Sequence, residues 1–510
     1  MTMKMNKLKL IIASMAVAFS MGSCDEFLSD APSKSTSVEP STIDHLEYLL
    51  NRYADFYQET NMAAILGTDT YGLLKEMTDV KASMPGINAV QFATWDIEGC
   101  ANYTRATTFS QEYGKIFRAN MILDNLSSVS GDADRKAYLE KEAKFIKAYS
   151  MFNLAVTYCL PYTQENKSEM GMTLKNSTSF EEFAGRATLE QTYKYIEENL
   201  EAALGITNDM TIVNNKYTHW RANKAAVNGF AARYWLQRED YTKAYNYAST
   251  ALESHNVLVN YNTDMRYSSN PSYATVNGQR VEILYPYTHD NQIDLNDRME
   301  WKEIMYFRNA YYGSWYYIPS KKLLDSYDHE YDLRYKYHIV DNYSFDRGLA
   351  PYEYPGYIFF YKDNIPAGPT TAEMILIRAE CLARQNKVSE AMAEVNKLRD
   401  VRMDAAAPAD KKYLSASSQD EAVKVIIDER MREMPFTMRW FDIVRLNHNS
   451  DSKDDVGTLT REYYPYTSAG VLVNDSPKTY TLEIGSRRYA TPIPQTDITS
   501  SGGVIEQNRY

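Results

Sequence analysis

The sequence is poor in the residues that build disulfide frameworks and thiolate metal sites. It holds four cysteines among 510 residues, and they stand far apart at Cys24, Cys100, Cys159 and Cys381. No Cys-x-x-Cys pair occurs, which excludes a disulfide scaffold and a thiolate zinc site. We expect the three cysteines after Cys24 to be small buried core residues.

Catalytic and cofactor motifs are also missing. The sequence contains no His-Glu-x-x-His, Gly-x-Ser-x-Gly, Gly-x-Gly-x-x-Gly or phosphate-loop pattern. Its seven histidines never stand at metal-ligand spacing. We therefore predict no cofactor and no metal centre. Calcium binding remains an alternative only in one loop, where oxygen ligands could come from Asp290, Asp294, Asn296 and Asp297. The favoured interpretation of this loop is solvated charge.

Positive charge is scarce. Lys and Arg number 55 against 67 Asp and Glu, a formal charge of −12, and this excess of acid argues against nucleic acid and anionic lipid as partners. No segment after residue 23 reaches the roughly 18 uncharged apolar residues of a membrane-spanning helix. Attachment to a membrane must then come from lipid.

The first residues have the pattern of an export signal. Three lysines precede an apolar run over residues 10–21, which is too short to span a bilayer, and Gly22-Ser23-Cys24 follows. The cysteine after two small residues predicts a lipoprotein signal peptide over residues 1–23 and lipidation of Cys24. The alternative is an ordinary secretory signal with a chance cysteine. Loss of three lysines and no acid takes the formal charge from −12 to −15, and residues 24–41 form a Ser-rich lipidated tether.

Apolar residues recur at helical spacing over most of the chain. Predicted helices cover residues 43–57, 112–126, 141–159 and 188–204, and two hairpins pair 221–237 with 241–253 and 371–384 with 389–402. Alanines on the second helix of the first hairpin resemble a tetratricopeptide repeat, in which small residues let helices approach closely. The pattern predicts a mainly α fold, a superhelical scaffold of tetratricopeptide-like helical hairpins.

Helical periodicity stops between about residues 256 and 369, where Asn, Pro, Gly and Tyr dominate. An insertion of this length predicts a binding region made of loops and short strands. We expect residues 42–510 to form a single domain. Its predicted parts are a helical scaffold at about 42–255 and 370–446, the loop-rich insertion at about 256–369, and a C-terminal irregular segment at 447–510.

Four segments occur in a fixed order along nearly the whole chain. They are residues 24–28 (CDEFL), 142–154 (EAKFIKAYSMFNL), 427–445 (IDERMREMPFTMRWFDIVR), and an ending made of 492–494 (PIP) and 507–510 (QNRY). Together they resemble the SusD/RagB family of outer-membrane nutrient-binding lipoproteins. The chain departs from the family's pattern at Thr437-Met438, where a Glu-Gly pair is common, and at Arg509, which stands for Pro-Gly.

The resemblance implies a SusD-like fold and a binding protein without catalysis. It implies a lid on a SusC-like, TonB-dependent transporter that captures glycan at the cell surface and delivers it for uptake. Asp25 and Glu26, directly after Cys24, resemble the family's signal for export to the outer face of the outer membrane. Some relatives bind peptides, so a peptide or glycoprotein fragment stays open as the ligand.

Tyrosine is unusually common, at 43 of 510 residues, and it joins an apolar ring to a hydroxyl group. Over residues 301–317, rings could stack on the apolar faces of sugars while Arg and Asn bond the sugar hydroxyls. The candidate ligand residues there are Trp301, Tyr306, Arg308, Asn309, Tyr311, Tyr312, Trp315 and Tyr316. A second candidate group, between the first helices, consists of Asp69, Tyr71, Trp95 and Asp96. The alternative for both groups is that the rings pack loops onto the scaffold.

Seven charged residues near the end of the scaffold could suggest a hydrolase. They are Glu429, Arg430, Arg432, Glu433, Arg439, Asp442 and Arg445. Glycosidases use two carboxyl groups, but Glu429 and Glu433 stand one helical turn apart beside arginines that favour the ionised form of both. We expect a structural ion-pair network. A surface glycoside hydrolase and a pure protein-interaction scaffold remain as alternatives.

Overall fold

Helices form where the sequence places apolar residues at helical spacing. The computed structural model describes residues 40–105, 107–179, 184–213, 216–291, 295–349, 352–467, 470–473 and 476–510. The predicted signal peptide, Cys24, most of the tether and Asp294 lie outside these residues. Helices α10 (Leu189–Ala203) and α18 (Thr371–Arg384) begin after Thr188 and Thr370, whose hydroxyl oxygens accept hydrogen bonds from backbone N–H groups three residues later.

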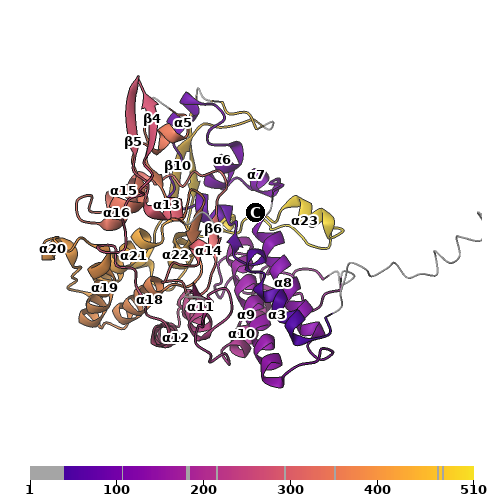
Figure 1. The fold of residues 1–510 in the computed structure, drawn as a ribbon. Helices are drawn as coiled ribbons and strands as arrows, with labels where there is room; N and C mark the ends of the chain where they lie inside the picture. Colours follow the sequence, from indigo (N-terminus) through magenta and orange to yellow (C-terminus); the bar gives the residue numbers. More distant parts are fainter. Residues whose placement is uncertain are drawn as a thin grey trace, which may run out of the picture.

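The scaffold is a row of helices in which each packs against the next. Besides α10 and α18 it comprises α8 (Thr108–Asn125), α9 (Ala133–Tyr158), α11 (Lys224–Gln237), α12 (Tyr241–Ser254), α19 (Val388–Arg402) and α21 (Gln419–Glu433). Helix α9 contacts α8 and α10, α12 contacts α18, and α18 contacts α19 and α21. Figure 1 shows this row below the irregular part of the molecule, from α8 and α9 to α18 and α19. The predicted fold class is confirmed.

Small residues let the scaffold helices approach closely. Ala225, Ala232, Ala244, Ala248 and Ala251 are completely buried in the cluster that joins α11, α12 and α18. An alanine side chain ends at Cβ, so facing helices come close without leaving cavities. The predicted resemblance of α12 to a repeat helix agrees with this packing.

Predicted helix ends differ from the structure by a few residues at several places. The helix predicted over 43–57 is α3 (Ile43–Asn51) followed by a 3₁₀ turn (Tyr53–Asp55), and α9 starts eight residues before its predicted start. The first eight residues of α9, ADRKAYLE, include two acidic and two basic side chains, so they lack the apolar pattern that signals a helix. Asp132 caps this end instead, accepting from the backbone N–H groups of Asp134 and Arg135.

The irregular part of the chain holds short elements. Before α8 lie α4 (Met62–Leu66), α5 (Lys75–Val80), α6 (Ile87–Ala93) and α7 (Ile97–Ala101). The insertion holds α13 (Tyr287–Asn291), α14 (Leu295–Arg298), α15 (Lys321–Ser326), α16 (Leu333–His338) and α17 (Tyr343–Asp346). The chain ends with α20 (Ala409–Lys412), α22 (Met438–Leu446), two 3₁₀ turns (Ser452–Asp454 and Arg487–Tyr489) and α23 (Gln495–Ser500). Helices of one or two turns show no period in the sequence, so the insertion predicted as loops and short strands also holds short helices that the periodicity did not indicate.

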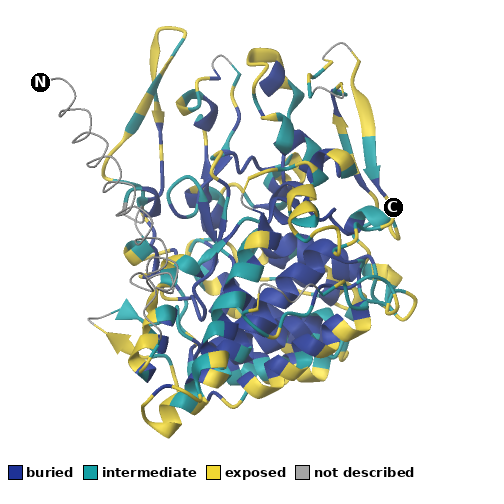
Figure 2. Ribbon diagram, turned by 90° about the vertical axis from the view of Figure 1, so that its right-hand side faces the viewer, coloured by how far each residue is buried: buried dark blue, intermediate teal, exposed yellow. Residues whose placement is uncertain are grey.

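Strands are short and mostly paired as hairpins. The hairpins are β2 (Ile212–Val213) with β3 (Lys216–Tyr217), β4 (Ser272–Val276) with β5 (Gln279–Ile283), β7 (Ile339–Val340) with β8 (Gly356–Tyr357), and β10 (Leu459–Tyr463) with β11 (Lys478–Leu482). One three-stranded sheet has the order β1 (Gln58–Glu59), β6 (Asn309–Tyr311), β9 (Asn364–Pro366). Figure 2 shows the buried residues gathered in the packed helices, while hairpins project from the opposite end with exposed surfaces.

The remaining cysteines are buried thiols, as predicted. Cys100, Cys159 and Cys381 are free and covered by other side chains, and burial raises the pKa of each thiol. Within the part of the chain that the structure describes, no helix is long and apolar enough to cross a membrane.

Candidate functional site

A polar cavity lies where the short N-terminal helices meet the insertion. Its volume is about 470 Å³, within the roughly 300–1,000 Å³ that is typical of small-ligand sites. We call it the polar cavity, and its wall consists of Gln58, Thr60, Met62, Gly86, Ile87, Asn88, Ala89, Tyr103, Arg105, Gln111, Tyr311, Tyr312, Gly313 and Ser314.

Strand pairing brings the two halves of this wall together. β1 runs parallel to β6, with Gln58 opposite Asn309 and Glu59 opposite Ala310. β9 covers the other edge of β6 in antiparallel register, and the Tyr312 N–H donates to the Asp363 carbonyl over 3.0 Å. The turn after β6 is thereby held against the segment that precedes α8.

Four side chains of the wall keep their polar groups open. In the described ranges, the side chains of Asn88, Tyr103, Arg105 and Tyr311 form no hydrogen bond or salt bridge. The Tyr103 ring packs edge-on against Phe92, with ring centroids 5.4 Å apart. Two tyrosine rings, an amide and a guanidinium group together offer apolar faces and hydrogen-bond donors to a ligand.

Tyr311 is folded back over its own turn. A methyl group at Gly313 would come within 2.6 Å of the Tyr311 hydroxyl oxygen, so only glycine leaves room for the ring in this position. Partial burial raises the pKa of the Tyr311 phenol, and the nearby Asp363 carboxylate adds to the rise. The hydroxyl group is therefore protonated at neutral pH and available as a donor.

Three of the predicted aromatic residues are core residues instead. Trp301 is 3% exposed and packs edge-on against Phe359, with ring centroids 5.0 Å apart. Tyr306 is 1% exposed and lies against Phe145 and Tyr149, and Tyr316 is buried as well. Because other side chains cover these rings, they offer no face to a ligand in this structure. We therefore assign Trp301, Tyr306 and Tyr316 packing roles.

Arg308 and Asn309 are also inside the molecule. The Arg308 guanidinium lies 3.9 Å from the centroid of the Tyr306 ring and donates to the Phe307 carbonyl. Asn309 is completely buried in β6, the central strand of the sheet. Both side chains are covered by the protein and neither lines the polar cavity, so their direct contact with a ligand stays a prediction.

Tyr311, Tyr312 and Trp315 are the predicted residues that lie at or beside the cavity. The two tyrosines belong to its wall, although Tyr312 is largely buried. Trp315 follows Ser314 of the wall, with a half-buried side chain and a φ of 64°. The Arg347 guanidinium and the Lys362 ammonium lie 4.9 and 4.8 Å from its ring centroid.

The second predicted group has structural roles. Trp95 is buried and its indole N–H donates to the Gly67 carbonyl over 3.1 Å, and Tyr71 is buried in a different hydrophobic cluster. Asp96 caps α7 by accepting from the Gly99 N–H. None of these three residues lines the polar cavity.

Asp69 is an ion-pair partner. Its carboxylate accepts from Arg439 at 2.8 and 2.6 Å and from Lys322 at 2.6 Å. Burial acts to raise the pKa of Asp69, but the two cations outweigh burial and hold the pKa below its ordinary range. The residue links α22 to the N-terminal segment and does not line the polar cavity.

Sequence reasoning missed Asn88, Tyr103, Arg105 and the two glutamines of the wall. Asn88 lies in α6, and Tyr103 and Arg105 lie in the loop after α7, where no periodic pattern marks the chain. The available signal was composition, because Asn102-Tyr103-Thr104-Arg105 combines an aromatic ring with an amide and a guanidinium, as residues 301–317 do.

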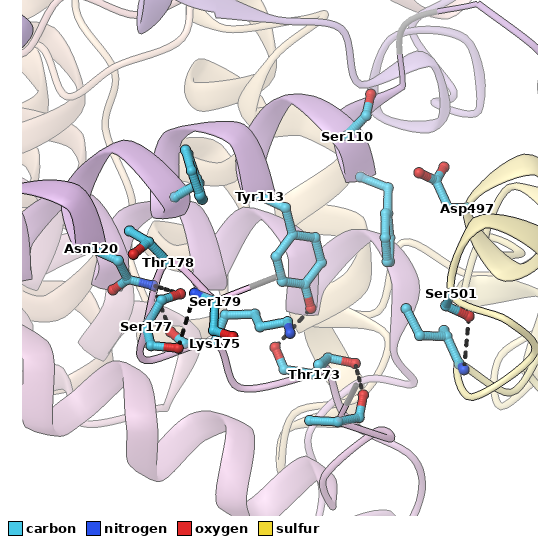
Figure 3. Close-up of a pocket in the computed structure, with 14 residues that line it drawn as sticks. Ser110, Tyr113, Asn120, Thr173, Lys175, Ser177, Thr178, Ser179, Asp497 and Ser501 are labelled. Carbon is cyan, nitrogen blue, oxygen red and sulfur yellow. Dashed lines mark hydrogen bonds between the residues drawn. The ribbon is translucent and has the colours of Figure 1, made fainter. Parts of the chain in front are cut away.

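A second cavity, of about 280 Å³, lies between α8 and the C-terminal helix α23 (Figure 3). Several polar groups around it bond one another. The Tyr113 hydroxyl donates to the Thr173 carbonyl over 2.8 Å, and the Asn120 amide donates to the Ser177 carbonyl over 3.2 Å. These bonds fasten the segment after α9 to α8.

The predicted charge cluster is a buried ion-pair network. Glu429 is completely buried and lies 2.8, 2.9 and 2.7 Å from nitrogens of Arg334, Arg399 and Arg432. Burial acts to raise the pKa of Glu429, but the three arginines outweigh it and hold the pKa well below its ordinary value. A carboxylate held in this way does not serve as a general acid.

The other carboxylates of the cluster are paired in the same manner. Glu433 accepts from Arg402 and Arg334 at 2.8 and 3.0 Å, and Asp442 lies 3.2 and 2.8 Å from Arg430 and Arg445. Against burial, which acts to raise both pKa values, these arginines lower the pKa of Glu433 and Asp442. The network ties α19, α21 and α22 together, as predicted.

Two of the loop side chains that the sequence offers as calcium ligands have partners within the protein. Asp290 accepts from His289 at 2.7 Å, and Asn296 accepts from the Tyr53 hydroxyl at 2.9 Å. Among the residues with a described placement, no group of three or more His, Cys, Asp or Glu side chains is arranged to hold a metal ion.

Family comparisons match both ends of the chain. A family model described as starch-binding and associating with the outer membrane matches residues 26–236, and the model of the SusD family matches residues 371–510. A comparison with curated protein sequences finds no match.

Solved structures with the same fold cover nearly the whole chain. A SusD superfamily protein from Bacteroides thetaiotaomicron is 18% identical, with a TM-score of 0.58 over 92% of this chain and 100% of its own. A laminarin-binding SusD-like protein and the surface glycan-binding protein A from Bacteroides uniformis are each 16% identical, with TM-scores of 0.58 over 92% of this chain and 99% of theirs. At this identity the likeness concerns the fold.

Proposed function

The chain belongs to the SusD/RagB family, and from this premise we propose that it binds glycan at the cell surface without catalysis, in the polar cavity. The observation that carries the proposal is the cavity wall, where the rings of Tyr103 and Tyr311 stand beside the open polar groups of Asn88 and Arg105. A sugar ring has apolar C–H faces that pack on aromatic rings and hydroxyl groups around its edge that need hydrogen-bond partners.

The proposed handling of the ligand follows the family resemblance. Lipid on Cys24 anchors the protein to the outer face of the outer membrane, and the protein delivers bound glycan to a SusC-like, TonB-dependent transporter for uptake. The matched family model describes proteins that associate with the outer membrane, and two proteins of the same fold are named as a laminarin-binding protein and a surface glycan-binding protein. Mass spectrometry of the membrane fraction tests the anchor, since an unmodified N-terminus would contradict it.

Calorimetry with a panel of purified oligosaccharides tests the binding site. We expect Tyr311→Ala to weaken binding by about 1–2 kcal/mol, or roughly 5- to 30-fold in Kd, because it removes one stacking face. Tyr311→Phe keeps the face and loses only the hydroxyl group, so it should weaken binding less. Tyr273→Ala is the matched control, because Tyr273 is exposed on the β4–β5 hairpin and lies outside the cavity wall.

The panel also separates the alternatives. Peptide binding without glycan binding would show that the ligand is a peptide, and the proposed role in uptake would be unchanged. New reducing ends after incubation with polysaccharide would favour a glycoside hydrolase, which the buried and ionised state of Glu429 and Glu433 argues against. If no ligand binds and Tyr311→Ala has no effect, the protein-interaction scaffold becomes the better hypothesis.

A further inference from the structure

The charge of the polar cavity differs from the charge of the chain. The whole sequence carries a formal charge of −12, yet none of the fourteen wall residues is Asp or Glu. Arg105 is the single charged side chain among them. The protein as a whole has more acidic than basic residues, but a cavity wall with one cation and no carboxylate attracts a negatively charged ligand.

Arg105 is also uncompensated. Its side chain is exposed and forms no salt bridge within the described ranges, whereas most other arginines described above are paired with buried carboxylates. Its positive charge acts on the Tyr103 phenol of the same wall: burial raises the pKa of Tyr103, and Arg105 opposes that rise. A free guanidinium group offers several N–H donors in a planar fork that matches a carboxylate or a sulfate.

A second cation, which forms no salt bridge with any described carboxylate, lies beside the wall. Arg347 donates from Nη2 to the carbonyl of Ser314, a wall residue, over 3.1 Å. Its guanidinium carbon lies 4.9 Å from the Trp315 ring centroid and 4.6 Å from that of Tyr316, and its Nε is buried without a hydrogen-bond partner. Lys362 approaches the same Trp315 ring, but Asp346 lies 3.0 Å from its ammonium group.

We propose that the polar cavity binds an acidic glycan, whose carboxylate or sulfate group pairs with Arg105 while a sugar face packs on Tyr103 or Tyr311. Arg347 adds positive potential from beside Ser314. The inference rests on the proposed glycan-binding function and names the chemical class of its ligand.

Matched pairs of polysaccharides test the inference. One pair is polygalacturonate and its carboxyl-reduced form, and the other is a sulfated galactan and its desulfated form. Each pair keeps the sugar backbone and changes only the anionic group, so the two pairs distinguish a carboxylate from a sulfate. Binding is measured by calorimetry with size-matched fragments at low and high NaCl concentration.

The acidic member of at least one pair should bind about 10- to 100-fold more tightly than its neutral counterpart, because the bond to Arg105 is charge-assisted. Arg105→Gln should abolish this preference, and Arg105→Lys should keep part of it. Arg280→Gln removes the same charge from the exposed β4–β5 hairpin, outside the wall, and should change nothing. Higher salt should weaken binding of the acidic member alone.

Two results overturn the inference in distinguishable ways. If neutral glycans bind as well as acidic ones, and Arg105→Gln leaves their affinity unchanged while Tyr311→Ala lowers it, the acidic ligand class is wrong and the glycan function stands. If no glycan of either kind binds, the proposed function fails together with the inference. An unchanged melting temperature of Arg105→Gln, expected for an exposed side chain, shows that the comparison uses folded protein.

Discussion

Replacing Glu429 by alanine should be one of the most damaging single changes to the stability of the scaffold. Glu429 is buried and pairs with Arg334, Arg399 and Arg432 at 2.7–2.9 Å. Removing one partner of a buried ion pair typically costs about 3–5 kcal/mol, because the remaining charge stays buried without compensation. Arg334 keeps Asp332 at 2.8 Å, which reduces the loss. We therefore expect about 3 kcal/mol in the free energy of unfolding.

The neighbouring residue provides a matched control. Asp428 is 41% exposed and pairs with the exposed Lys424 one helical turn earlier. Because water screens this pair, Asp428→Ala should cost about 0.5 kcal/mol or less. Both variants remove one carboxylate from α21, so a difference between them reports burial and pairing rather than helix propensity.

Urea unfolding followed by tryptophan fluorescence measures both variants. The folded-state pKa of Glu429 is depressed below its ordinary value of 4.5, so its contribution is present above about pH 4.5 and is lost as the pH falls further. The gap between the wild-type protein and Glu429→Ala should therefore narrow under acid conditions. A Glu429→Ala variant that unfolds at the same urea concentration as Asp428→Ala at pH 7 would refute the stabilising role of the network.

Three further predictions concern buried or constrained positions. Trp301→Ala should lower the free energy of unfolding by about 3–5 kcal/mol and leave the Kd of the folded protein for its ligand unchanged in calorimetry. A loss of affinity without a loss of stability would show that Trp301 contacts the ligand. Gly114→Ala should raise the melting temperature, since Gly114 lies inside α8 and its new methyl group would have only an ordinary contact with Arg118 at 3.5 Å, a gain of about 0.5–1 kcal/mol. Burial lowers the pKa of His219 and His338 to about 4, so between pH 6.5 and 4 these histidines bind protons in the unfolded chain but not in the folded protein. Each histidine should therefore lower the free energy of unfolding by roughly 3 kcal/mol at pH 4. The denaturation midpoint of His338→Asn should therefore depend less steeply on pH than that of the wild-type protein. An equal or steeper pH dependence in the variant would contradict this.

The scaffold could be predicted from the sequence because its signals are local. The period of apolar residues and the hydroxyl residues Thr188 and Thr370 mark α10 and α18 within a few neighbouring positions. The charge cluster at Glu429 could be interpreted for the same reason, since a spacing of four residues fixes two side chains on one helix face.

The proposed binding site could be predicted only in part because burial depends on distant segments. The spacing within residues 301–317 does not reveal that Phe359 covers Trp301 or that Phe145 covers Tyr306. Tyr311 and Tyr312 were found by composition, whereas Tyr103 and Arg105 lie some 200 positions away and meet them only after the strands pair. Composition identified which residue types bind sugars, but not which of them face the cavity.

The pairing of β1 with β6 has a consequence for when the polar cavity forms during folding. The two strands are separated by about 250 positions, and closing such a long loop costs conformational entropy that local contacts do not incur. Helices α8 to α12 lie close together along the chain and can pack early in folding, while β1 must wait for β6. We therefore expect the polar cavity to form late in folding, after the helical row is complete. A folding intermediate that lacks the β1–β6 pairing would be helical and compact yet unable to hold a ligand.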